Sequence, residues 1–209
     1  MGRTLVGRRA FVIWVGANAA GWLLGVVVVL VLSTLEELTH FGNMTYVGLG
    51  MGGSVGFAQW LIARKWFGAT ARWMWATAIG MTLPFLLVDL MRVRDLNSFL
   101  LSALAAIGGL LAGWMQRNSL QSLSSKANRW VIVSGVAWMC PALLVELVIV
   151  PGHPKTILDS VRNIGSIGFG GVVLGVITGL ALASPLNARE SQHGSADPPL
   201  RNTKPKSSC

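Results

Sequence analysis

Long apolar segments separated by short polar loops are the main feature of the hydropathy pattern along this chain. Six of them approach the length of about 20 mostly apolar residues that a helix needs to cross a bilayer. The pattern therefore predicts an all-α integral membrane protein with a bundle of six transmembrane helices in residues 1–184. The helices are expected at about 10–32, 45–63, 71–91, 98–116, 129–150 and 164–184. Residues 185–209 are rich in Ser, Pro, Asn, Lys and Arg, which is typical of a disordered basic tail.

An internal repeat emerges when the chain is shifted by 57 residues, which aligns the second and third predicted helices with the fourth and fifth. The segment PFLLVDL at 84–90 then meets PALLVEL at 141–147. Chance does not readily produce ungapped agreement of such residue types across two helices. We therefore predict a duplicated helix pair, with repeat units at about 45–91 and 98–150.

The first helix of each repeat unit is glycine-rich, and we call it helix A and its successor helix B. The predicted order is B-(AB)-(AB)-A, with successive pairs in the same orientation, so the internal repeat is parallel. Each A helix has a small residue at every fourth position, a spacing that lets membrane helices approach closely. These positions are Gly48, Gly52 and Gly56; Ala105, Gly109 and Gly113; and Gly171, Gly175 and Gly179. Gln59 and Gln116 project from the same face, so we predict hydrogen bonds between helices, with ligand contact as the alternative.

The charge distribution supports a membrane location and argues against nucleic-acid binding. Charged residues make up 12% of the 209 residues, compared with about 25% in soluble domains. The net charge is +9, but the basic residues flank apolar segments instead of forming one patch. Most of them lie in the N-terminus, the second and fourth loops and the tail, and the alternate side has only Arg92, Arg94, Lys155 and Arg162. Because basic residues favour the cytoplasmic side, both termini are expected there.

Tryptophan positions divide into two groups. Most of the nine tryptophans cluster at the predicted cytoplasmic helix ends, as an interfacial aromatic belt does. Trp14, Trp22 and Trp138 lie deeper and are expected to fill the bundle interior. Stacking on a pigment or quinone is the alternative for such residues.

Both repeat units share a motif. The first unit has Gly52, Gly56, Gln59, Trp60, Arg64, Arg72, Trp73 and Trp75. The second keeps Gly109, Gly113, Gln116, Arg129 and Trp130, but has Arg117 at the position of the first tryptophan. This pattern, GxxxGxxQW…RxW, resembles a helix-pair repeat of uncharacterised multi-helix membrane proteins of bacteria, mainly cyanobacteria. The resemblance covers roughly residues 45–150 and implies a helix-pair fold in a bacterial cytoplasmic or thylakoid membrane, but no activity.

Asp89 and Glu146 occupy equivalent positions near the outer end of each B helix. A carboxylate is disfavoured at a helix C-terminus, where the helix dipole is negative, and an acid inside a membrane is a candidate ion or proton site. The alternative is an interfacial acid that is solvated or paired with a base. Arg92 is the expected partner of Asp89, and Arg162 or Lys155 that of Glu146.

Three classes of function follow, none of them enzymatic, because the chain has no recognisable catalytic or phosphate-binding motif and no Cys/His spacing typical of a metal site. No cofactor is expected. The favoured class is a non-catalytic scaffold or accessory subunit that acts through glycine-stripe packing against its own copies or a larger membrane complex. The second is a small-solute or ion transporter that uses Asp89 and Glu146, and the third is a binder of a lipid, quinone or pigment.

Overall fold

A computed structural model describes residues 3–34, 42–92, 98–121, 127–149, 165 and 167–182, which are helical apart from short turns and contain no strand. The helices are α1 (Arg3–Ser33), α3 (Asn43–Phe67), α4 (Arg72–Leu90), α5 (Ser98–Gln121) and α6 (Ala127–Ile149). A further helix, Ile167–Leu182, is called here the C-terminal helix. The all-α class is confirmed. The predicted tail at 185–209 lies outside the described residues.

Four helical segments are both long and apolar enough to cross a membrane: Gly7–Ser33, Arg72–Leu90, Phe99–Gln121 and Ala127–Leu147. Of the six predicted spans, four therefore have both the length and the hydropathy that crossing a membrane requires. The helix α3 is long enough but contains many glycines and polar residues, which lower its hydropathy. The described part of the C-terminal helix is apolar but short. Its sixteen residues extend about 24 Å, less than the roughly 30 Å of a bilayer core.

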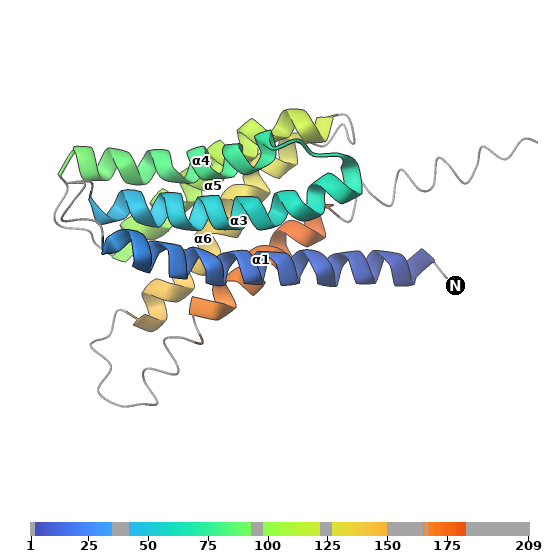
Figure 1. The fold of residues 1–209 in the computed structure, drawn as a ribbon, viewed down its shortest axis with the longest axis horizontal. Coiled ribbons are helices and arrows are strands. Elements are labelled where there is room, and N and C mark those ends of the chain that lie inside the picture. Colours follow the sequence, from blue (N-terminus) through green and yellow to red (C-terminus); the bar gives the residue numbers. More distant parts are fainter. Residues whose placement is uncertain are drawn as a thin grey trace, which may run out of the picture.

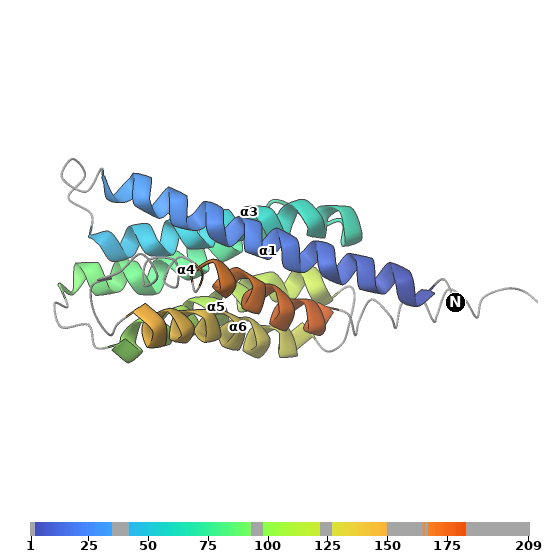
Figure 2. The same cartoon turned by 90° about the horizontal axis from the view of Figure 1, so that it is seen from below.

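The helices lie side by side along the long axis of the molecule, as Figures 1 and 2 show from two directions. Each helix from α1 to α6 contacts the next one in the chain. The C-terminal helix lies against both α1 and α6, since its glycines approach Ala19 and Pro141. The six helices thus form a closed ring, in which the first and the last described helices are neighbours.

A glycine ends one helix, and two prolines lie inside others. Gly68 ends α3 with φ of 71°, a left-handed conformation that glycine adopts without strain, and its N–H donates to the carbonyl of Ala63. Pro84 and Pro141 lie inside α4 and α6, so both helices continue past a residue that lacks a backbone N–H.

The interior contains the large side chains that the sequence assigned to it. Trp14, Trp22 and Trp138 are 1%, 6% and 3% exposed, which confirms that prediction. The interior also contains Trp73 and Trp130, which the sequence placed in the interfacial belt but which are 1% and 5% exposed.

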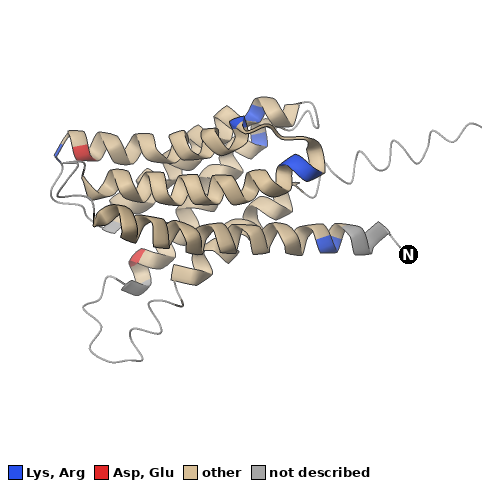
Figure 3. Cartoon of the chain, viewed as in Figure 1, with Lys and Arg blue, Asp and Glu red and all other residues tan. Residues whose placement is uncertain are grey.

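Charged residues lie at the two ends of the bundle (Figure 3). Arg64 and Lys65 are in the last turn of α3, at the end where α4 begins, and Asp89 is near the other end of α4. The charge asymmetry expected from the sequence is therefore present along the bundle axis.

Candidate functional site

The glycine stripe of α3 packs against α4. A Cβ built on Gly52 would lie 2.6 Å from the Cβ of Met81, and one built on Gly56 would lie 2.8 Å from the Cβ of Thr77. Real Cβ atoms essentially never approach this closely, so the two helices are as near as glycine allows. Gly48 makes the same kind of approach to the α4 backbone.

The other two stripes make equivalent contacts. On α5, a Cβ built on Gly109 would lie 2.6 Å from the carbonyl oxygen of Ser134 in α6. One built on Gly113 would lie 2.9 Å from the Cβ of the same serine. On the C-terminal helix, Gly175 lies against Val15 of α1, and a Cβ added to it would be 2.8 Å from the Val15 Cα. Gly171 and Gly179 approach Trp22 and Phe11 of the same helix. Ala105 instead lines a central cavity. The stripes therefore pack inside the chain and are not open to a partner.

Gln59 joins three helices. Its Nε2 donates to the Oδ1 of Asn18 on α1 at 2.8 Å, and its Oε1 accepts from the indole Nε1 of Trp73 on α4 at 3.3 Å. The glutamine is 3% exposed, so the bonds are made away from water. Asn18 in turn donates to the carbonyl of Trp14, one turn earlier in α1.

Gln116, 57 residues further along the chain, makes the same two kinds of bond. Its Nε2 donates to the Oγ1 of Thr77 on α4 at 2.7 Å, and its Oε1 accepts from Trp130 on α6 at 2.8 Å. A third indole, that of Trp14 on α1, donates to Thr178 on the C-terminal helix at 2.9 Å. Together with the bonds of Gln59, these contacts form one buried polar layer that links all six helices.

Sequence reasoning identified the two glutamines of this polar layer but not its threonines. Thr77 and Thr178 are 1% and 2% exposed, yet each resembles an ordinary helix residue in the sequence. One signal was available for the indoles. Trp73 and Trp130 stand fourteen residues after Gln59 and Gln116, respectively, and each donates to the glutamine before it.

Asp89 is bound by the N-terminal turn of α3. One of its carboxylate oxygens accepts from both the backbone N–H and the hydroxyl of Thr45, each at 2.6 Å. Gly42, just before α3, is so close that a Cβ there would overlap the carboxylate. In the described ranges no ion pair joins Asp89 to Arg92, so that predicted pairing is wrong. The positive end of the α3 dipole stabilises the charge instead.

Glu146 has an equivalent environment near the end of α6. Its carboxylate accepts from the backbone N–H of Ser102 at 3.1 Å and from the Ser102 hydroxyl. Glu146 is 6% exposed, so it is buried and not solvated at an interface. Its predicted partners Arg162 and Lys155 lie outside the described residues. Each acid thus ties the end of one helix to the beginning of the helix that precedes it.

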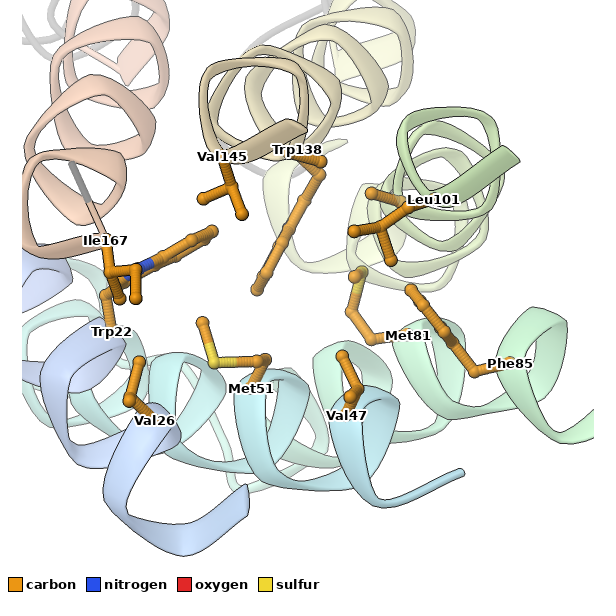
Figure 4. Close-up of a pocket in the computed structure, with 12 residues that line it drawn as sticks. Trp22, Val26, Val47, Met51, Met81, Phe85, Leu101, Trp138, Val145 and Ile167 are labelled. Carbon is orange, nitrogen blue, oxygen red and sulfur yellow. The ribbon is translucent and has the colours of Figure 1, made fainter. Parts of the chain in front are cut away.

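A partly open central cavity of about 160 Å³ lies between the helices of the ring (Figure 4). All six helices contribute to its wall, which is made almost entirely of carbon and sulfur atoms. The lining residues with large side chains include Trp22, Met51, Met81, Phe85 and Trp138.

Comparisons with known proteins add no family assignment. Neither a scan against protein-family models nor searches of curated proteins and solved structures found a match to this chain.

Proposed function

We propose that the chain is a six-span integral membrane protein built from three A–B helix pairs. Two are the duplicated units, α3 with α4 and α5 with α6, and the third consists of the C-terminal helix and α1. Matching contacts in the three pairs support this arrangement. The glycine contacts are Gly56 with Thr77, Gly113 with Ser134 and Gly175 with Asn18. The indole hydrogen bonds are Trp73 to Gln59, Trp130 to Gln116 and Trp14 to Thr178.

Helix α3, which has a low hydropathy, and the C-terminal helix, whose described part is short, both fit this proposal. The polar groups of α3 face other helices, because Thr45 bonds to Asp89 and Gln59 bonds to Asn18 and Trp73. Its hydropathy therefore understates how apolar its lipid-facing surface is. The C-terminal helix lies between α1 and α6, so its short length is bridged by longer neighbours.

The proposed orientation places both termini in the cytoplasm, since most described basic residues lie at one end of the bundle (Figure 3). Single cysteines at Arg64 and Arg92, in a chain without Cys140 and Cys209, test it. A membrane-impermeant thiol reagent added outside intact cells should label Arg92→Cys and not Arg64→Cys. The reverse pattern would overturn the orientation.

The role that this geometry supports best is that of a non-catalytic scaffold or accessory subunit. The observation that carries it is the buried polar layer. Its amides, hydroxyls and indoles bond to one another between neighbouring helices. A transport path or reactive site needs polar groups that can exchange partners with a substrate, whereas a rigid subunit needs them fixed. Asp89 and Glu146 are likewise engaged by Thr45 and Ser102, which supports a structural role for both acids.

A protein partner would then bind to the outer surface of the bundle, because the glycine stripes are already packed inside the chain. A Cβ added at Gly16 on α1 or at Gly53 on α3 would have no atom within 4 Å, so close helix approach remains open at both. Cross-linking in native membranes, followed by affinity purification in mild detergent, tests the proposal. A stoichiometric membrane partner or second copy is the expected result, and recovery of the single chain alone would contradict it.

Two variants refine that experiment. Gly16→Leu and Gly53→Leu should both leave the fold intact, since each new side chain enters open space. A partner that packs on α1 should be captured less by Gly16→Leu and equally well by Gly53→Leu. Loss of folding in either variant would show that these faces are not open.

A further inference from the structure

The central cavity differs from ordinary packing irregularity in size and position. Protein interiors contain few voids larger than a water molecule, whereas this cavity, which is partly open to the outside of the bundle, has a volume of about 160 Å³. It lies on the bundle axis, where residues of every helix meet around it (Figure 4). Engineered cavities of about 150 Å³ with apolar walls bind benzene or xenon. This cavity is therefore large enough for a six-membered ring or a short piece of hydrocarbon chain.

The lining determines the chemistry of an occupant. A buried water needs two to four polar partners, and the wall offers aromatic, aliphatic and thioether groups. The indole N–H of Trp22, which is buried and has no hydrogen-bond partner among the described residues, is the one unpaired donor on a residue of this wall. The indoles of Trp22 and Trp138 stand side by side with ring centroids 5.8 Å apart, tilted by 33°, and they form one aromatic wall. Met51 and Met81 lie across from them (Figure 4), and flexible methionines adapt to irregular apolar shapes.

The polar layer lies beside the cavity and leaves it few donors. Asn18 is one turn from Trp22 in α1, and Thr77 is one turn from Met81 in α4. Both polar side chains already bond to other helices. A charged or strongly polar ligand would lose its hydration in this cavity without replacement hydrogen bonds.

We propose that the central cavity is a binding site for an uncharged, predominantly hydrocarbon group about the size of a six-membered ring. This function goes beyond the proposed scaffold role and does not depend on it. The same chemistry is supplied by the chain of a membrane lipid or by a free cyclic hydrocarbon. Trp22 and Trp138 form the contact surface for either source.

Hexafluorobenzene is a suitable probe, because fluorine NMR separates a bound resonance from the resonance of probe dissolved in detergent. The full chain, purified and delipidated in detergent, should show a saturable bound resonance. Ala105 lines the cavity and is 4% exposed, so Ala105→Leu fills part of the space. It should abolish the bound resonance or weaken binding at least tenfold.

Ala103→Leu is the matched control, because Ala103 is exposed on the same helix two residues away. It should bind the probe like the unaltered chain. If Ala105→Leu does not fold, Ala142→Val, which narrows the cavity from α6, replaces it. Absence of a bound resonance in the delipidated chain, or equal binding by the cavity variant and its control, would overturn the proposal.

Mass spectrometry of the gently purified protein distinguishes the sources. A retained lipid that Ala105→Leu loses and Ala103→Leu keeps assigns the site to a lipid chain. A retained free hydrocarbon with the same variant dependence assigns it to a small ligand. Capture of a protein partner in the scaffold experiment has no bearing on these results, so the two proposals fail separately.

Discussion

Replacing Gly175 by alanine measures how tightly the C-terminal helix closes the ring against α1. The new Cβ would lie 2.8 Å from the Cα of Val15 and 3.0 Å from the Cβ of Asn18. Ordinary contacts begin near 3.4 Å, so the two helices must separate by about 0.6 Å. The neighbouring atom is backbone, which cannot rotate away as a flexible side chain can.

The magnitude follows from two opposing effects. Alanine is favoured over glycine in a helix interior by about 1 kcal/mol, and overpacking a close contact costs about 1–3 kcal/mol. The free energy of unfolding should therefore fall by roughly 0–2 kcal/mol in Gly175→Ala. A Cβ at Gly53 enters open space, so Gly53→Ala keeps only the favourable effect. The two variants should differ by about 1–3 kcal/mol.

Titration with a denaturing detergent in mixed micelles, followed by circular dichroism, measures the unfolding free energy of both variants and of the unaltered chain. Equal helix content before titration shows that each variant starts from the folded state. If Gly175→Ala proves as stable as Gly53→Ala, the close contact between the C-terminal helix and α1 is refuted, and with it the closed ring.

Further predictions concern the polar contacts and use the same titration. Gln116→Leu should lower the unfolding free energy by about 1–3 kcal/mol, because it removes bonds to two helices and leaves a buried indole N–H unpaired. Gln59→Leu should lower it less, since its indole bond is longer at 3.3 Å, and the opposite ranking would count against this. Ser102→Ala and Glu146→Gln should show a coupling of about 0.5–2 kcal/mol in a double-mutant cycle; additive losses would mean that the two groups do not interact. Gly42→Ala should destabilise the protein by displacing the carboxylate that binds the start of α3, and an unchanged transition would contradict that contact.

Local patterns in the chain were sufficient to find the two candidate acids but not the group that binds Asp89. The acids Asp89 and Glu146 were identified because a carboxylate within an apolar segment is rare at any position. The partner of Asp89 was predicted wrongly as Arg92, three residues away. The actual donor, Thr45, is 44 residues away. Opposite charge suggested the nearer base, but an unsatisfied helix N-terminus is an equally good partner for a carboxylate.

The sequence by itself determined where the helices lie, because apolar length and glycine spacing are properties of contiguous residues. It also indicated which helix faces have side chains small enough for close packing. Only the tertiary structure decided which helix each face meets. The Trp14–Thr178 bond joins residues 164 positions apart, and no local period encodes such a pairing. The cavity is likewise a property of the ring, because its wall exists only after residues from six helices have come together.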